Sequence, residues 1–444
     1  MVDAEKEEAK NYILLEDKTL RLKVTEKSIL ETILDSPVNN YWDYWIKDKH
    51  FFLIRLKDSE EFISKSKSII CEAKFPIMSK FFSITKLPHS EKKLPEIAKN
   101  RSDIRLNRQS CKLPENLDPN RPVDETMRKF IRNLALSELE CKLKFFIINS
   151  FEELLCRGVF GAFQLTPFGS SVNGLGWGSS GLDLCLTTKY QPDPNPNFVA
   201  SSAGLLDGSM KRQRCIKMYT TLMRVGLIPG VNNANQPNNQ TVQLFSNFTS
   251  TDITITCTDP VTLEFFKMSE ILYQLTRADE RLFHLFHFCK LWAEVQGCIS
   301  PTFSHFNLTM LIISYLQVKR PFPVVPPLEP FFQSTQIQLE SEHIQDQSSS
   351  FTDILQGFFH HIGTFDFTSS GANLFLGKTI RKPNRDVLLI LDPARSSNMA
   401  VKVTKNDLEN LTRIALKSYR LMGSGCNLQN LLRPIAQDTK KKIN

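Results

Sequence analysis

The chain has 444 residues, of which 41% are hydrophobic and 23% are charged. This composition supports about two or three domains with apolar cores and excludes a disordered chain. Lys and Arg number 55 against 47 for Asp and Glu, and the net charge of +8 suits a polyanionic partner such as RNA without requiring one. The sequence contains no apolar window of ~18 residues, so it predicts no membrane span.

The N-terminus and the cysteines leave two alternatives for the compartment. Residues 1–12, MVDAEKEEAKNY, lack the apolar region of a signal peptide and the Arg-rich character of a mitochondrial presequence. The 10 cysteines form no C-x-x-C pair and no zinc-ligand spacing, which predicts reduced, structural thiols inside the cell. Either the protein stays in the cytosol or nucleus, or this chain begins after a targeting segment.

Residues 1–90 are expected to form a small α+β module. HFFLIRLK at 50–57 is an apolar run typical of a buried strand, and FFSITK at 81–86 is a second strand-like piece. Between them, SEEFISKSKSII at 59–70 has helical spacing of its apolar residues. Residues 91–123 are rich in Pro, Asn and basic residues, which predicts a positively charged linker.

Residues 124–262 are expected to form a second domain in which helices precede strands. Apolar residues at intervals of three and four over 124–160 predict two helices. The stretch 164–188 then switches to a strand, a Gly-rich turn and another strand, and 242–258 returns to strand alternation. The polar, turn-rich insertion between them contains a basic helix around 211–214.

The remainder of the chain is predicted to be mostly helical, as a domain over 263–435. A long apolar-periodic segment runs from 263 to 296, and another runs from 306 to 317. Residues 320–350 form a Pro-rich and then Ser/Gln-rich loop, and 436–444 are a basic tail.

The clearest chemical signal lies in the strand–turn–strand stretch of the second domain. Gly169, Ser170 and Ser171 form a Gly-Ser turn after a strand, and its backbone N–H groups and hydroxyls suit a phosphate. Asp183 follows on the next strand, and Asp252, in the acidic strand TDITIT, is expected to lie beside it. Carboxylates opposite a phosphate cradle are what a two-metal nucleotidyl-transfer site needs, because Mg²⁺ prefers oxygen ligands.

The order of motifs resembles the nucleotidyltransferases of the DNA polymerase β type. It is most similar to the noncanonical poly(A) polymerase and terminal uridylyltransferase group, above all to its mitochondrial members. The resemblance runs from about Leu136 to Leu411. Its motifs are PFGSSVNGLG, LDLCL, TDITIT, SEILYQLTRADERL, LFHFCKLWAEVQG, FNLTMLIISYLQ, ILQGFFHHIGTFDF and LDPARSSNMAV.

The resemblance implies an α+β fold with three parts. These are an RNA-recognition-like module (1–90), a nucleotidyltransferase palm with a mixed sheet and leading helices (124–262), and a helical PAP-associated domain (263–435). The implied reaction is template-independent addition of AMP from ATP to an RNA 3′ end, with Mg²⁺ or Mn²⁺ as cofactor. A homodimer and a mitochondrial location match the family's mitochondrial members, and a cytoplasmic location is the alternative.

The resemblance also implies roles for individual residues. Asp183 and Asp252 are the expected catalytic residues and metal ligands, and Asp252 orients the 3′ oxygen. The residues expected to bind the nucleotide are Gly169, Ser170, Ser171, Asn173, Lys290 and Phe306. Among them Lys290 serves as a point charge for a phosphate, and Phe306 stacks under the base.

One position departs from the family pattern. The family places an acidic residue at both ends of an Asp-x-Asp pair, and here the first position is Gly181. Loss of one metal-coordinating carboxylate is expected to lower the rate by about 10²–10⁴-fold or more. Met268 stands where a base-reading Asn is frequent, so ATP or UTP preference is not predicted. Three functions stay open: a weakened poly(A) polymerase, an inactive relative that binds RNA or a partner, and a uridylyltransferase.

Several other polar residues are predicted to be structural. Asp279 and Arg281 resemble a family ion pair within the helical domain. His284 and His287 lie three residues apart on an apolar helix without an intervening Glu, so packing is favoured over metal binding. Phe306 taken alone would be a core residue, because its neighbours are apolar.

Overall fold

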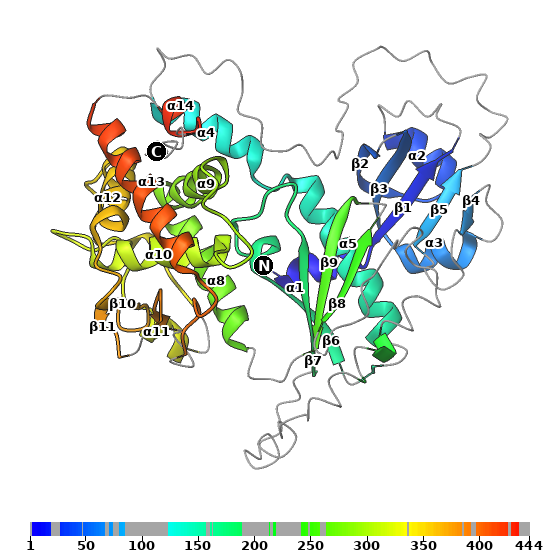
Figure 1. Cartoon of the computed structure of the whole chain (residues 1–444). Helices are drawn as coiled ribbons and strands as arrows, with labels where there is room; N and C mark the ends of the chain where they lie inside the picture. The colour runs from blue at the N-terminus through cyan, green and yellow to red at the C-terminus, as the bar shows by residue number, and fades with distance from the viewer. Residues whose placement is uncertain are drawn as a thin grey trace, which may run out of the picture. The chain divides into compact units, whose positions relative to one another are not determined.

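The computed structural model gives the chain two compact units (Figure 1). The first comprises Met1–Gln109, Leu136–Val172 and Gly176–Phe266, and the second comprises Ser110–Ala135, Asn173–Leu175 and Lys267–Asn444. The structure describes residues 2–18, 27–46, 48–66, 71–73, 80–84, 123–156, 160–161, 163–188, 213, 216–218, 241–246, 249–257, 263–334, 337–383, 386–391, 397–424 and 428–434. Residues 91–122 of the predicted linker, most of the basic segment at 211–214 and the tail at 436–444 lie outside this description.

The first unit begins with a small α+β module. Its elements are α1 (Val2–Ala9), β1 (Tyr12–Asp17), α2 (Lys27–Leu34), β2 (Val38–Ile46), β3 (Lys49–Leu56), α3 (Ser59–Lys65), β4 (Cys71–Ala73) and β5 (Phe81–Ile84). The sheet has the order β2-β3-β1-β5-β4, with β1 antiparallel to β3 and parallel to β5. From β1 to β5 this follows the split β-α-β-β-α-β arrangement. The two predicted strands are present as β3 and β5, and the helix expected over 59–70 is shorter because α3 ends at Lys65.

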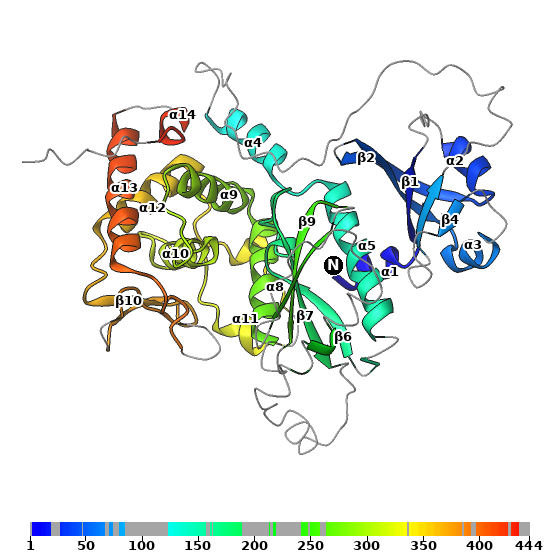
Figure 2. The same ribbon diagram turned by 45° about the vertical axis from the view of Figure 1, so that its right-hand side comes forward.

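Both faces of the module's sheet are covered. Side chains alternate along β1, so Ile13 and Leu15 pack in one cluster with the α2 and α3 residues. Tyr12 and Leu14 face the opposite cluster, which contains Phe146 of α5 (Glu138–Leu154). Figures 1 and 2 both place α5 between this sheet and the sheet of the palm. RNA-recognition modules stack bases on the sheet face opposite their helices, and here that face packs against α5.

Polar contacts reinforce this packing. The buried ammonium of Lys80 donates to the Lys10 carbonyl and to Asn149 Oδ1, both at 2.7 Å. Lys142 Nζ lies 2.9 Å from a Glu5 oxygen and 3.2 Å from a Glu8 oxygen of α1. The module therefore joins the palm through a continuous core that is bounded by ion pairs.

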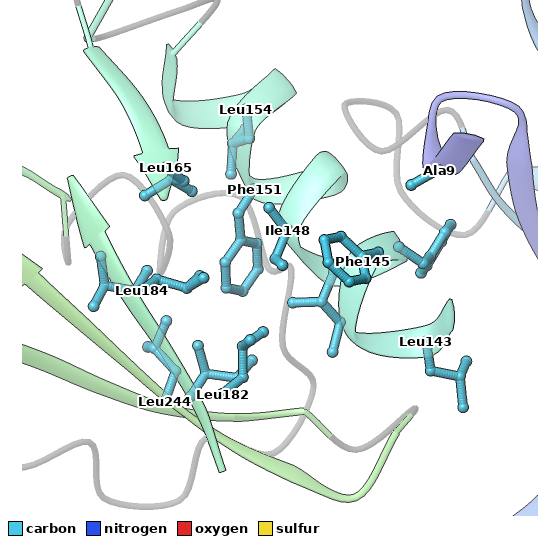
Figure 3. Packing of buried hydrophobic residues seen from close by; sticks show 14 of the residues in the cluster. Ala9, Leu143, Phe145, Ile148, Phe151, Leu154, Leu165, Leu182, Leu184 and Leu244 are labelled. Atoms are coloured by element: carbon cyan, nitrogen blue, oxygen red, sulfur yellow. The ribbon is translucent and has the colours of Figure 1, made fainter. Parts of the chain in front are cut away.

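The palm has a four-stranded mixed sheet against α5. Its strands are β6 (Phe163–Phe168), β7 (Leu182–Thr188), β8 (Thr241–Ser246) and β9 (Thr251–Cys257), in the order β6-β7-β9-β8. Strands β7 and β9 are parallel, and the other pairs are antiparallel. Figure 3 shows Leu182 and Leu184 of β7 on the side of Ile148 and Phe151 of α5. The α+β class with mixed sheets is as predicted.

The second unit is mainly helical. Its helices are α4 (Val123–Leu134), α8 (Leu263–Ala278), α9 (Glu280–Val295), α10 (His305–Val318), α11 (Glu329–Gln333), α12 (Phe351–Thr364), α13 (Lys405–Gly423) and α14 (Leu428–Leu431). A small sheet has the order β11 (Lys378–Arg381), β10 (Ser370–Asn373), β12 (Ile390–Leu391). In the part of the chain that is described, no helix is long and apolar enough to cross a membrane.

The segment predicted to be helical from 263 to 296 consists of two helices, α8 and α9. Asp279 interrupts it with an extended backbone (φ −147°), and its carboxylate accepts a hydrogen bond from the Arg281 N–H. Because Asp is a favoured N-cap, a new helix begins at Glu280 although the apolar period continues. The predicted loop at 320–350 also contains a short helix, α11.

Phe146 tests the core shared by the module and the palm. It is buried, and its ring packs edge-on against Phe81 with centroids 5.2 Å apart. We expect Phe146→Ala to lower the free energy of unfolding by about 3–5 kcal/mol through lost contacts and a cavity. Phe322, which is 59% exposed, is the control, and Phe322→Ala should change stability by less than about 0.5 kcal/mol. Urea denaturation of both variants checks this, and equal losses would contradict the shared core.

Candidate active site

The two predicted carboxylates lie on one face of the palm sheet. In the parallel register of β7 and β9, Leu182 pairs with Ile253 and Asp183 pairs with Thr254. Leu182 and Ile253 are buried toward α5, so Asp183 and Asp252 point to the opposite face. Asp252 is exposed and Asp183 is half-buried. The strand period thus separates an apolar face from a face that carries carboxylates.

The Gly-Ser turn lies directly against Asp183. Gly169–Ser171 form a 3-10 turn after β6, and Phe168 is the register partner of Asp183. Gly169 has φ +70°, a left-handed conformation that favours glycine. A Cβ at Gly169 would lie 3.2 Å from Asp183 Oδ2, so the carboxylate takes up the space that a side chain would need.

A second glycine, Gly176, lets the following loop approach the turn closely. A Cβ at Gly176 would lie 2.4 Å from the Ser170 carbonyl oxygen, a contact that only glycine avoids. Ser171 is buried, and its hydroxyl donates to the Gly181 carbonyl at 2.9 Å. The turn is therefore fixed both to the loop that follows it and to the residue that precedes β7.

Lys144 of α5 is a residue of this region that the sequence analysis did not identify. Its side chain is buried, and its ammonium lies 2.8 Å from the Ser180 carbonyl and 3.2 Å from Ser171 Oγ. The Gly181 carbonyl is 3.4 Å away. The available signal was the pair of lysines in KLKFF, inside a helix whose other residues follow an apolar pattern.

Burial and charge act in opposite directions on this pair of groups. Burial lowers the pKa of Lys144 to about 8, against smaller raising effects of Cys141, Glu140 and Asp183. Burial raises the pKa of Asp183, and the Lys144 ammonium limits that rise. Each charge therefore stabilises the other in a setting that water reaches poorly.

Gly181 lies beside Asp252 without a conformational need for glycine. Its φ is outside the left-handed region, unlike that of Gly169. A Cβ built at Gly181 would lie 3.2 Å from the Asp252 carbonyl oxygen and 3.8 Å from Asp252 Cβ. A side chain there would press on this backbone oxygen by a few tenths of an ångström, and it would share the face of Asp183 and Asp252.

The carboxylates set a limit on metal binding. Among the described residues, no group of three or more His, Cys, Asp or Glu side chains is placed to share a metal ion. Two carboxylates on one face suit a single divalent cation such as Mg²⁺, which also keeps waters and binds substrate phosphates. The residues that are present fit one ion better than two.

Three of the predicted nucleotide-binding residues belong to the second unit, and two of them, Asn173 and Lys290, shape the Asn173–Leu175 segment. Asn173 Oδ1 accepts from the Leu175 N–H at 2.9 Å, so Asn173 does form a turn. Lys290 is buried on α9, and its ammonium donates to the Leu175 carbonyl at 2.5 Å. His287 Nε2 lies 3.2 Å from the Gly174 carbonyl. Gly174 has φ +77°, and a Cβ there would lie 2.7 Å from Thr276 Oγ1.

Phe306 does not lie in the core. It is the second residue of α10 and is 37% exposed, so its ring is accessible for stacking. Ser304 caps this helix in a reciprocal arrangement with Asn307, which fixes the backbone at Phe306. Met268, at the position considered for base recognition, is buried in α8.

The contacts of Asp279, Arg281, His284 and His287 agree with the structural roles predicted for them. The Arg281 guanidinium contacts both Asp279 oxygens and also donates to the Asp346 and Ser349 carbonyls at 2.6 Å. His284 and His287 are buried among aromatic rings, including that of Phe283. Burial lowers the pKa of His287 to about 3, so the ring is neutral at physiological pH.

The sequence of the chain is similar to those of known poly(A) RNA polymerases. Residues 123–264 match the family model of the central palm domain of mitochondrial-like poly(A) RNA polymerase. The mitochondrial poly(A) RNA polymerase of Drosophila melanogaster is 24% identical over 332 residues, 66% of this chain and 52% of that protein. The Mus musculus enzyme is 23% identical over 436 residues, 89% of this chain and 72% of that protein. The chain thus spans about half the length of the fly relative and under three quarters of the mouse relative.

A solved structure extends the similarity to nearly the whole chain. The crystal structure of mtPAP in complex with UTP superposes with a TM-score of 0.76 at 20% identity, covering 98% of both chains. At this identity the match establishes the fold, including the α+β module that precedes the palm.

The contact between Gly169 and Asp183 can be tested by substitution. Gly169→Ala forces a side chain into a left-handed backbone and against the carboxylate, so we expect a loss of about 1–2 kcal/mol of stability. Gly423 of α13 has nothing within 4 Å of its Cβ position. Gly423→Ala should therefore leave stability unchanged or raise it by up to about 1 kcal/mol. Urea denaturation measures both, and similar shifts in the two variants would refute the crowding at Gly169.

Proposed function

We propose that the chain is a member of the noncanonical poly(A) polymerase family, to which its palm domain and its relatives are similar, and that it is a template-independent RNA 3′-end nucleotidyltransferase. It transfers AMP from ATP to the 3′ hydroxyl of RNA and releases pyrophosphate. The observation that supports this best is the placement of Asp183 and Asp252 on one face of β7 and β9 with the Gly-Ser turn against Asp183.

The proposed roles of the residues follow from their positions. The Gly169–Ser171 turn holds the triphosphate with its hydroxyls and backbone N–H groups. Asp252, which is exposed, orients the attacking 3′ oxygen. Phe306 stacks on the base through its accessible ring. Lys290 contributes positive charge for a phosphate and also fixes the Leu175 backbone.

The cofactor in this proposal is Mg²⁺ or Mn²⁺, with Asp183 and Asp252 as its protein ligands. A bound ion supplies Lewis acidity at the phosphoryl oxygens. With Gly181 in place of a third carboxylate, we expect the rate to be lower by about 10²–10⁴-fold than with a full set.

The biological setting is inferred from the same relatives. RNA 3′ ends are the partner, which the net charge of +8 suits. The covered sheet face of the N-terminal module implies that RNA contacts come from elsewhere in the chain. A mitochondrial location follows the mitochondrial relatives, with a cytoplasmic location as the alternative. A homodimer is proposed from the family resemblance alone.

A second candidate function is an inactive relative that binds nucleotide or RNA. Gly181 and the lack of a third carboxylate among the described residues favour it. In that case the Gly169–Ser171 turn persists as a binding surface. Uridylyl transfer is a variant of the first proposal that differs only in base choice.

Incorporation of labelled nucleotide distinguishes these functions. Purified chain, Gly181→Asp and Asp183→Ala are each incubated with an oligo(A) primer, ATP or UTP, and Mg²⁺ or Mn²⁺. We expect slow extension by the natural chain, none above background by Asp183→Ala, and extension by Gly181→Asp faster by about 10²-fold or more. Gly181→Asn is the matched control, because it fills the same space without the charge.

The outcomes separate clearly. If only Gly181→Asp extends the primer, the natural chain is the inactive relative. If none of the proteins extends it while all are folded, nucleotidyl transfer is refuted. A preference for UTP over ATP would replace adenylyl with uridylyl transfer.

A further inference from the structure

Two lysines on the same helix have opposite surroundings. Lys142 and Lys144 both lie on α5, and both are buried. Lys142 faces the N-terminal module, where the carboxylates of Glu5 and Glu8 neutralise it directly. Lys144 reaches the Gly-Ser turn, and the hydrogen bonds described for its ammonium all go to uncharged oxygens.

The acceptors of Lys144 connect the two halves of the candidate site. Ser171 closes the turn, and Ser180 and Gly181 lead into β7 and Asp183. One ammonium therefore fastens the phosphate-binding turn to the strand that carries the buried carboxylate. Ser171 strengthens the connection by donating to the same Gly181 carbonyl.

The charge of Lys144 also acts on Asp183. The electrostatic interaction between the ammonium and the carboxylate stabilises both charged forms against burial. Lys144 is buried and Asp183 is half-buried, so water screens this interaction less than it would between two surface charges. A divalent cation bound to Asp183 would meet the repulsion of the same ammonium.

We propose that the charged Lys144 ammonium holds the Gly169–Ser171 turn to β7 and weakens divalent-cation binding at Asp183. The inference rests on the proposed function for the identity of the metal ligands. Lys144 is a positioning residue, because it acts through Ser171, Gly181 and Asp183 rather than on the substrate.

This proposal gives a result opposite to that of a purely structural role. Removing a structural contact loosens the site and weakens metal binding. Removing a repulsive charge strengthens it, and for a unit charge several ångströms from a dication we expect Mn²⁺ to bind roughly tenfold more tightly.

The test is a titration of the full chain with Mn²⁺ alone, followed by electron paramagnetic resonance of the free ion. Lys144→Gln removes the charge, and we expect its affinity for Mn²⁺ to rise roughly tenfold. Lys144→Arg keeps the charge and should stay within about twofold of the natural chain. Lys142→Gln is the matched control, since it removes a buried lysine of the same helix that contacts Glu5 and Glu8.

Two further variants complete the design. In Lys144→Gln combined with Asp183→Asn, the gain in affinity should disappear, which assigns it to Asp183. If Lys144→Gln does not fold by circular dichroism, Lys144→Met replaces it in the same titration. If neither neutral variant folds, the Lys144→Arg titration decides, and an affinity more than about tenfold above that of the natural chain overturns the proposal.

The Mn²⁺ titration tests the role of Lys144, and primer extension tests the proposed function, so the two can fail independently. Unchanged or weaker Mn²⁺ binding by a folded Lys144→Gln, including no detectable binding by either protein, overturns the role of Lys144. A gain in affinity supports that role whether or not the natural chain extends a primer. Primer extension alone decides whether the chain is a polymerase.

Discussion

The structure of the first unit depends on the packing of α5 between two sheets. Leu182, Ile253 and their neighbours bury their side chains against one side of the helix, and Tyr12 and Leu14 belong to the same core. Because side chains alternate along a strand, this burial forces Asp183 and Asp252 onto the opposite face of β7 and β9. A shift of one residue in either strand would bury a carboxylate in the core, so the hydrophobic pattern also fixes the site.

The same helix carries the one buried cation next to the carboxylates among the contacts described. A helix packed on both sides has few positions at which a charged side chain can reach water. The buried charge of Lys142 is compensated by ion pairs with Glu5 and Glu8. That of Lys144 is compensated by hydrogen bonds to carbonyl and hydroxyl oxygens and by the nearby negative charge of Asp183. The packing of α5 therefore determines where the Lys144 charge lies relative to Asp183, so a change in that packing would also change the charge distribution of the site.

Strand alternation and the order of the motifs predicted several of these features from the sequence. The adjacency of the Asp183 and Asp252 strands, the Asp279–Arg281 pair and the packing of His284 and His287 all follow from local patterns. Other features depend on contacts between residues far apart in sequence. Phe81 meets Phe146, and Lys144 meets Ser180, only once the tertiary fold is formed.

Two details could not be read from the local pattern. The apolar period from 263 to 296 does not show the break at Asp279, because the period continues while a single capping carboxylate starts a new helix. The apolar neighbours of Phe306 taken alone favour a core position, whereas the residue lies in the first turn of α10 and is 37% exposed. Composition around a residue does not determine which side of the helix it occupies.

Gly181 adds no carboxylate to the face that carries Asp183 and Asp252. Gly169 and Gly174 have left-handed backbones and Gly176 makes a close approach, whereas Gly181 has no left-handed backbone and its Cβ position lies 3.2 Å from the Asp252 carbonyl oxygen. A side chain at Gly181 would lie on the face of Asp183 and Asp252, so the glycine leaves that face without a third carboxylate. With one carboxylate fewer and the Lys144 ammonium close by, the electrostatic field at Asp183 is less negative than three carboxylates would make it. For the proposed function, a less negative field favours phosphate binding at the turn and disfavours metal binding at the carboxylates.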